Sequence, residues 1–481
     1  MTSKPGPPIS VAYKRLASHY LGVARRGPEE GYSLEQDWSQ IRPVWDWLIE
    51  AGGNPELVIS YALAFDSYQD RLGMWRDSVI RGRHGAAAAR EVGLPHSEAI
   101  ILNNLGVAYG HLGEVRLSIE SYERALKLYK ELGHREGEAN VLCNLGTSYH
   151  RLGEIGRAID FYRQCLDISQ ELNSPRGEAR ALGNLGLAQN DLGNLRGAVE
   201  YYNLALVRVR ELGDRREEGI ILNNLGVAHV NLGEANQAAE LHQEALKIHR
   251  ECGERRSEAN ALGNLGLDYY RLGDLGRAIS CFEDQLRIVQ ELGDRRAEGN
   301  ALGNLGLAYA DAGELEKAAD RYLERLALSN EIEDRRGVAI TLNNLGSLYR
   351  KLGESGRSIE LHKEALRMQR EIGDVRRQGA VLGSLGLDYF SLGDLRRATQ
   401  YYKNALAVCR KTGDRDGEAS WAWNLGLAYE ELGDGDLAVS MMRITVDYEQ
   451  KIGHPDARTH ARRMEACRKP AMAGGQSEPL S

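Results

Sequence analysis

The chain has 481 residues and lacks several features that define large classes of proteins. Its longest apolar stretches fall far short of the about 20 residues that a membrane-spanning helix needs. Its six cysteines form no CxxC pair and no disulfide framework pattern, so we expect reduced thiols that are mostly buried. Its net charge of -8 gives no overall attraction to nucleic acid or to anionic lipid, so we expect neither as a partner.

Motifs of catalysis and export are missing as well. No phosphate-binding loop of the form GxxxxGKS or GxxxxGKT occurs, and neither GxSxG nor HExxH is present. The histidines follow no metal-ligand spacing. No charged segment followed by an apolar one opens the chain in the manner of a signal peptide. We therefore expect a cytoplasmic protein that is not an enzyme and that needs no cofactor and no metal.

Repetition is what the sequence has in abundance. From residue 97 a 40-residue pattern occurs nine times without insertion or deletion. The motif Asn-Leu-Gly begins at Asn104 and returns every 40 residues, with Ser384 as the one variant, and a second glycine follows seven residues after the first, as at Gly113. A fixed period of about 20 to 50 residues is typical of a solenoid, in which each unit buries its apolar face against its neighbours.

Each repeat predicts two helices. Between 142 and 152, leucine and tyrosine recur at the spacing of one helical face. Gly153 is expected to end that helix, because glycine adopts the left-handed C-cap conformation at little cost. Glu154 can cap the next helix or compensate the charge of its N-terminus. Gly146 stands in mid-helix at a cost of about 1 kcal/mol relative to alanine. We therefore expect a close approach between helices at Gly146, with Ala158 on the other side.

This pattern resembles the tetratricopeptide repeat from 97 to about 455. The resemblance is carried in each unit by residues equivalent to Leu145, Gly146, Tyr149, Gly153, Ala158, Tyr162 and Cys165. The usual 34-residue unit is lengthened to 40, and in this the chain is similar to LGN/Pins-type polarity adaptors and to many bacterial signalling proteins. The resemblance implies an all-α solenoid of helical hairpins, coiled as a right-handed superhelix, whose first helices line a concave groove that binds peptides.

Four regions follow from the register. We predict a helical cap at 1-60, with amphipathic helices at 10-25 and 34-51, and a degenerate first repeat at 61-96, in which Gly73 and Gly93 keep the register and Asp66 replaces the mid-helix glycine. Nine repeats occupy 97-456, and 457-481 forms the C-terminal end and a flexible tail. The stretch 37-48 resembles the segment before the repeats in bacterial STAND-type NTPases. The first region is therefore either a cap or a signalling element.

The strongest candidate binding residues are the repeated asparagines, which we call the asparagine row. Asparagine is a poor helix former, and its amide can both donate to and accept from an extended peptide backbone. The resemblance places this position on the concave face and favours peptide binding. The alternative is that each asparagine bonds a neighbouring helix and fixes the geometry of the repeat. The row comprises Asn104, Asn144, Asn184, Asn224, Asn264, Asn304, Asn344 and Asn424.

Two sets of arginines have different expected roles. Arginines predicted inside the groove would favour a ligand with an acidic stretch; they are Arg151, Arg180, Arg271 and Arg350. Paired arginines in the loops, such as 215-216 and 295-296, stand beside acidic residues. We expect these pairs to form local ion pairs, with contact to an acidic ligand as the alternative.

These features predict a non-catalytic scaffold or adaptor that holds an extended protein or peptide segment in its groove. An acidic segment is one candidate partner. A second hypothesis is a sensor or regulatory module that acts on a separate STAND-type ATPase or transcription factor. A third is an enzyme with a hidden site, which would need residues that break the repeat. The oligomeric state does not follow from the sequence.

Overall fold

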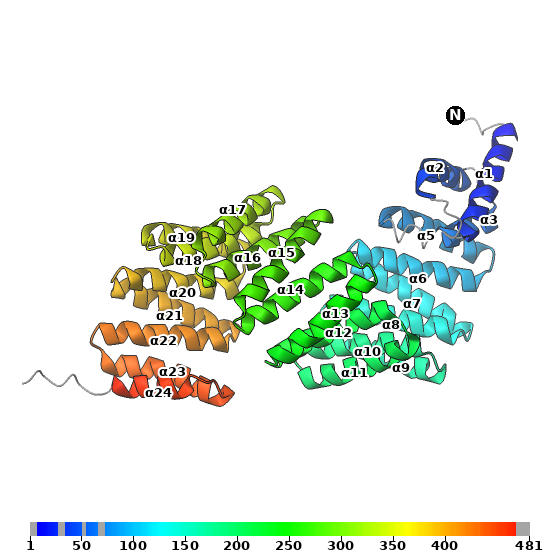
Figure 1. The fold of residues 1–481 in the computed structure, drawn as a ribbon. Helices are drawn as coiled ribbons and strands as arrows, with labels where there is room; N and C mark the ends of the chain where they lie inside the picture. The colour runs from blue at the N-terminus through cyan, green and yellow to red at the C-terminus, as the bar shows by residue number, and fades with distance from the viewer. Residues whose placement is uncertain (1–6, 27–33, 51–53, 66–72, 468–481) are drawn as a thin grey trace, which may run out of the picture. The chain divides into compact units, whose positions relative to one another are not determined.

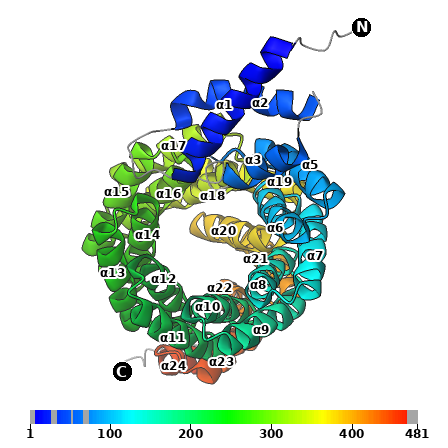
Figure 2. The ribbon, with the colours of Figure 1, turned by 90° about the vertical axis from the view of Figure 1, so that its right-hand side faces the viewer.

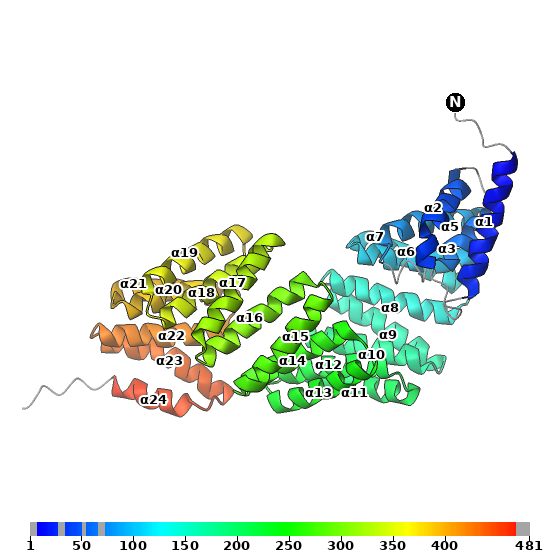
Figure 3. The ribbon, with the colours of Figure 1, turned by 45° about the horizontal axis from the view of Figure 1, so that its top comes forward.

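The computed structural model describes residues 7-26, 34-50, 54-65 and 73-467, which are helical with short connections and contain no strand (Figure 1). The chain divides into two compact units, Met1–Gly253 and Glu254–Ser481, which are described separately below. Within each unit, consecutive helices stack as antiparallel neighbours (Figures 1 and 3). The predicted all-α solenoid of helical hairpins is confirmed. None of the described helices is long and apolar enough to cross a membrane.

The first unit contains the N-terminal helices and four of the 40-residue repeats. Its helices are α1 (Pro7–Arg26), α2 (Leu34–Glu50), α3 (Pro55–Ala64), α5 (Trp75–Glu91), α6 (Pro95–His111), α7 (Val115–Glu131), α8 (Arg135–Arg151), α9 (Ile155–Glu171), α10 (Pro175–Asp191), α11 (Leu195–Leu212), α12 (Arg215–Asn231) and α13 (Ala235–Glu251). Helices α6, α8, α10 and α12, the first of each repeat, lie on the inner side of this unit's curve, and α7, α9, α11 and α13 lie outside them (Figure 2).

The second unit contains the other five repeats and a short final helix. Its helices are α14 (Arg255–Arg271), α15 (Leu275–Glu291), α16 (Arg295–Asp311), α17 (Leu315–Glu331), α18 (Arg335–Lys351), α19 (Ser355–Ile372), α20 (Val375–Ser391), α21 (Leu395–Thr412), α22 (Arg415–Glu431), α23 (Gly435–Ile452) and α24 (Ala457–Ala466). Successive first helices contact one another here, as α14 does α16 and α16 does α18.

The N-terminal region starts with the two helices expected there, α1 and α2. Helix α3 packs against α5 as a further hairpin, so the pair preceding the nine repeats begins at Pro55. The guanidinium of Arg81 is buried in this region and lies 4.5 Å from the ring centre of Trp38, a cation–π contact that offsets part of its desolvation. Asp66 and the predicted tail from 468 lie outside the described residues.

Helix ends follow the predicted chemistry in part. Gly153 has φ +80°, the left-handed conformation, and its equivalents share it. Asp274 accepts a hydrogen bond from the backbone N–H of Arg277 and so caps α15, as expected. Glu154 makes no such bond, so of its two expected roles it does not have that of a cap. Its longer side chain accepts from Arg157 at 2.9 Å instead.

The mid-helix glycines mark the closest approach within each hairpin, as predicted. A Cβ atom on Gly186 would lie 2.7 Å from the ring of Tyr202, and one on Gly266 would lie 2.5 Å from the ring of Phe282. Both distances are too short for van der Waals contact. The nearest partner is therefore the aromatic ring of the second helix, whereas the alanine equivalent to Ala158 was expected. Because glycine has no side chain, the ring can pack directly against the backbone of the first helix.

Two glycines on α10 provide a matched test of this packing. Gly186→Ala should lower the free energy of unfolding by about 1 to 3 kcal/mol, because the ring of Tyr202 must move. Gly183→Ala introduces a methyl group with nothing within 4 Å and should raise stability by up to about 1 kcal/mol, because alanine is the better helix former. Thermal and chemical unfolding measure both changes. Shifts of the same sign would contradict the packing assigned to Gly186.

Candidate functional site

A polar stripe runs along the exposed side of each first helix. On α10 it consists of Arg176, Arg180, Asn184, Leu187 and Asp191, which are exposed or half-buried and recur at intervals of three or four residues. Residues at this spacing share one face of a helix. In the first unit this stripe belongs to the helices on the inner side of the curve (Figure 2). It is the surface on which the sequence placed its candidate binding residues.

Some members of the asparagine row bond the neighbouring first helix. The amide nitrogen of Asn144 donates to the side-chain oxygen of Asn103 at 2.9 Å, and that of Asn184 donates to the sulfur of Cys143 at 3.2 Å. Asn104 accepts from Asn103, and Asn424 donates to the backbone oxygen of its own helix at Ser420. The scaffolding alternative therefore describes Asn144 and Asn184.

Other members have amides without a protein partner. Asn224, Asn304 and Asn344 are half-buried, and their side-chain amides make no hydrogen bond to any residue that the structure describes. The residue 41 positions earlier explains the difference. Asn144 and Asn184 meet an asparagine or a cysteine there, whereas Asn224, Asn304 and Asn344 have glycine, at 183, 263 and 303. A glycine offers no side-chain acceptor. The sequence contains this difference, but its effect becomes clear only from the hydrogen bonds between neighbouring first helices.

The four predicted groove arginines all contact other groups of the protein. Arg151 donates to the backbone oxygen of Gly110 at 2.9 Å, and Arg180 donates to Asn140 at 2.6 Å. Arg271 lies 3.5 Å from Asp268, and Arg350 lies 3.4 Å from Asp388. These contacts fix the direction of each guanidinium. Whether the four also touch a ligand is addressed as a proposal below.

A cavity opens on the polar stripe of the first unit. Its volume is about 530 Å³, and it is lined by the first turns of α8, α10 and α12 and by the ends of α9 and α11. Arg176, Arg180 and Arg216 line it together with Glu217. Burial, followed by the neighbouring charge of Asp214, raises the pKa of Glu217. The cavity thus contains three guanidinium groups and a carboxyl group that becomes protonated, and therefore neutral, at a higher pH than usual.

A pair of thiols behind this cavity was not singled out by sequence reasoning. Cys143 and Cys165 are both fully buried. The hydrogen bond between them, together with the nearby guanidinium of Arg180 and the amide of Asn184, lowers the pKa of Cys143. The low pKa reflects polar neighbours that the spacing of the cysteines, 22 residues apart, did not indicate.

The first arginine of each loop has the structural role that was expected. Arg295 lies 2.9 Å from the buried Glu298 on its own helix and 2.6 Å from Glu331 at the end of the second helix. Arg215 repeats the arrangement with Glu218 and Glu251. Each such arginine ties the start of a hairpin to its end.

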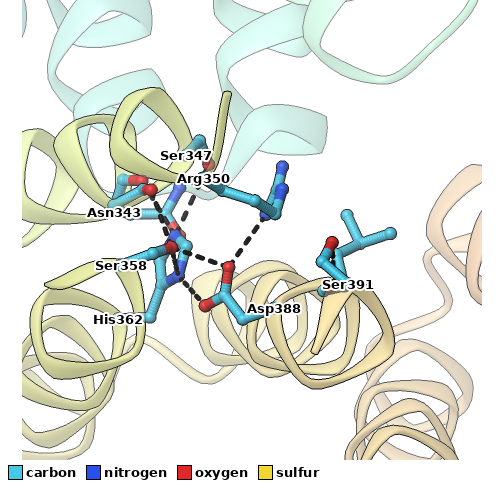
Figure 4. A network of polar contacts seen from close by, with 9 residues as sticks. Asn343, Ser347, Arg350, Ser358, His362, Asp388 and Ser391 are labelled. Atoms are coloured by element: carbon cyan, nitrogen blue, oxygen red, sulfur yellow. Dashed lines mark hydrogen bonds and ion pairs between the residues drawn. The ribbon is translucent and has the colours of Figure 1, made fainter. Parts of the chain in front are cut away.

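A buried polar network connects α18, α19 and α20 (Figure 4). Nδ1 of His362 lies 2.6 Å from Oδ2 of Asp388, and neither side chain is exposed. Ser358 and Arg350 reach the other carboxylate oxygen of Asp388, at 2.6 Å and 3.4 Å. Ser347 lies 3.4 Å from Nε2 of His362, so a serine, a histidine and an aspartate stand in the order of a catalytic relay.

The hydrogen-bond geometry argues against a relay. Nε2 of His362 lies 3.1 Å from the backbone oxygen of Asn343, closer than the hydroxyl of Ser347. A carbonyl oxygen only accepts, so Nε2 carries a proton and is not available to take one from Ser347. The network is therefore a buried set of hydrogen bonds that holds three helices together. Groups of three or more metal-ligating side chains close enough to hold an ion are not found among the described residues.

The sequence marks this network by a paired exception to the repeat. Position 362 is tyrosine, phenylalanine or methionine in most repeats and histidine only at 242 and 362. The position 26 residues later is a small or apolar residue elsewhere, and aspartate only at 268 and 388. A histidine thus always comes with an aspartate in the following repeat. A buried imidazole nitrogen needs a hydrogen-bond partner, and the aspartate supplies one, which explains the pairing.

Stacked helical hairpins with a polar stripe on their first helices define the chain as a helical repeat protein. Segments 97–171, 177–251, 257–331 and 377–443 match one tetratricopeptide repeat model, and 338–372 match a second. The chain belongs to the tetratricopeptide repeat family. A comparison with curated protein sequences gives no match.

Two solved structures show the same fold at low sequence identity. One is a Signal Transduction ATPase with Numerous Domains (STAND) from Pyrococcus horikoshii with a tetratricopeptide repeat sensor: identity is 16%, coverage is 76% of this chain and 54% of that one, and the TM-score is 0.52. The other is the apo quorum sensor NprR from B. thuringiensis, with 17% identity, coverage of 75% and 99%, and a TM-score of 0.51.

The buried pair of His362 and Asp388 can be tested against the chain's own alternative. Asp388→Ala should lower the free energy of unfolding by about 1 to 3 kcal/mol, because it leaves Nδ1 of His362 buried without its hydrogen-bond partner. Adding His362→Tyr creates the combination found at Tyr202 and Ala228, and should restore most of the loss. Chemical unfolding of the single and double variants gives the coupling energy. Simple additivity of the two losses would refute the pairing.

Proposed function

We propose that the protein is a non-catalytic scaffold whose first helices hold an extended segment of a partner protein. The observation that supports this most directly is the set of amides without a protein partner, at Asn224, Asn304 and Asn344. Each offers one donor group and one acceptor, which is what an extended backbone needs on its exposed edge. A folded protein rarely leaves half-buried amides in register without a use for them.

The neighbouring residues support the same use. Three positions after each asparagine stands an apolar or small residue, such as Val227 or Leu307, and Leu307 is 37% exposed. The surface beside the amides is therefore apolar enough to contact side chains of a ligand. Asn144 and Asn184, which bond the adjacent helix, would keep the same surface rigid. Arg180 and Arg151 would add positive charge for a partner that contains acidic residues.

The structural similarities favour two versions of this role. NprR is described as a quorum sensor, and the P. horikoshii protein as an ATPase with a tetratricopeptide repeat sensor. Both descriptions name a sensor. A sensor module that acts on a separate ATPase is the second candidate, and the similarity to the STAND protein favours it. Both versions require the same ligand-binding surface.

Two asparagines of the first unit separate binding from scaffolding. The ligand is a peptide selected on the full chain from a random phage-displayed library. Asn224→Ala should weaken its binding by about 0.5 to 1.5 kcal/mol, the net value of a hydrogen bond, and leave the melting temperature unchanged. Asn184→Ala removes a bond to Cys143 and should lower stability. Titration calorimetry and thermal melting measure the two effects.

A gain-of-contact variant provides the control. Gly183→Asn places an amide 41 residues before Asn224, where open space exists, and should recreate the bond seen between Asn103 and Asn144. Binding should then weaken as it does in Asn224→Ala, although the amide is still present. If Asn224→Ala binds normally and melts early, the open amides are scaffolding and the proposed surface is wrong.

A further inference from the structure

The second arginine of each loop differs in environment from the first. It occupies the second position of the first helix in six successive repeats, is exposed in all of them, and belongs to the polar stripe. These residues, which we call the arginine row, are Arg176, Arg216, Arg256, Arg296, Arg336 and Arg376. From the sequence, paired arginines in the loops were expected to form local ion pairs, with contact to an acidic ligand as the alternative. The structure separates the two sets.

The separation is clearest in the second unit. Arg255 and Arg295 each contact two glutamates, whereas the adjacent Arg256 and Arg296 form no ion pair with any residue that the structure describes. The nearest cap carboxylate, that of Asp294, accepts from the backbone N–H of Ala297. Arg376 also has no partner among the described residues.

One member of the row shows how a carboxylate pairs with an arginine at this position. Arg336 lies 3.0 Å from Asp374, the cap of the next repeat, and Arg377 also contacts this carboxylate at 2.7 Å. In the first unit Arg176 lies 3.8 Å from Asp214, and Arg176 and Arg216 line the cavity with Arg180. Carboxylates thus do approach this row where the chain itself supplies them. Arg256, Arg296 and Arg376 are exposed and form no ion pair with the described residues.

The spacing of the row limits the kind of partner. Neighbouring first helices of the second unit contact each other, so their axes lie about 10 Å apart. A chain in the polyproline II conformation advances about 3.1 Å per residue with three residues per turn, so every third side chain faces the same way at intervals of about 9 Å. An acidic residue at every third position would therefore meet one arginine in each repeat.

The asparagine row lies within reach of the same segment. Arg296 and Asn304 are eight residues apart on α16, a distance of about 12 Å along the helix at 1.5 Å per residue. Asn300, also exposed, lies between them on the same stripe. A segment that bonds the amides through its backbone can extend glutamate side chains towards the arginines. The net negative charge of the whole chain does not prevent this contact, because the arginine row concentrates positive charge locally.

We propose that the part of the arginine row in the second unit, Arg256, Arg296, Arg336 and Arg376, binds an extended acidic segment of a partner protein in which a carboxylate recurs at every third residue. This inference rests on the proposed function and specifies its partner. Because the pairs are exposed, each contributes little, and recognition comes from several pairs in register. The row would also accelerate association at low salt, because it presents one sign of charge along one edge of the unit.

The probe is a labelled peptide of roughly 15 residues with the repeated triplet Glu-Pro-Ser, which favours polyproline II. A peptide of the same composition with its glutamates contiguous controls for charge. Fluorescence anisotropy with the full chain should show tighter binding of the spaced peptide. That binding should weaken as the salt concentration rises from about 0.05 M to about 0.5 M.

Adjacent arginines supply the matched variants. Arg256→Ala combined with Arg296→Ala should weaken binding of the spaced peptide by about three- to tenfold with an unchanged melting temperature. Arg255→Ala combined with Arg295→Ala should leave binding unchanged and lower the melting temperature, because those residues hold Glu258 and Glu298. Equal loss of binding in both double variants would overturn the assignment.

Two further outcomes would overturn it. If the contiguous peptide binds as tightly as the spaced one, the row does not read spacing. If single-stranded DNA of similar length binds as tightly, the row is a general polyanion surface. The phage-selected peptide distinguishes this failure from failure of the proposed function. If that peptide still depends on Asn224 while the Glu-Pro-Ser peptide does not bind, the scaffold holds and the acidic partner does not.

Discussion

The contact between a mid-helix glycine and an aromatic ring sets the geometry on which the remaining structure depends. In each repeat the second helix places a large side chain against the bare backbone of the first, as Tyr202 does at Gly186. The ring fixes the distance and the rotation between the two helices. Because the same contact recurs every 40 residues, every first helix presents the same stripe. The regular spacing of the asparagine and arginine rows is a consequence of this packing.

Much of this could be predicted from the sequence. The period, the two helices of each repeat, the left-handed glycine at 153 and the close approach at Gly146 all follow from local rules about glycine and helical faces. The caps were predicted less well, because Glu154 accepts from the side chain of Arg157 and makes no cap bond, whereas the shorter Asp274 accepts from both the backbone N–H and the guanidinium of Arg277. Local chemistry predicts that some residue caps the helix, but side-chain length determines which.

The binding surface could be predicted only in outline. The asparagine row is evident in the sequence as a residue that recurs every 40 positions. Whether its amide lacks a protein partner depends on the residue 41 positions earlier, which lies on another helix. The same holds for the adjacent Arg295 and Arg296, which look alike in sequence and face different surroundings. The network of His362 and Asp388 likewise spans two repeats. Interactions between repeats are decided by tertiary contacts, so a reading of one repeat at a time misses them.

In five of the nine repeats an arginine ties the start of the hairpin to its end, which has a consequence for how the array opens. Arg215 joins α12 to the end of α13 through Glu251, and Arg295 joins α16 to the end of α17 through Glu331. The free ends of a hairpin are thereby closed opposite its turn, so fraying of a single helix breaks an ion pair as well as its packing. Local opening therefore favours a whole hairpin as the cooperative unit. These ion pairs are exposed and alike, so a rise in ionic strength weakens all of them together.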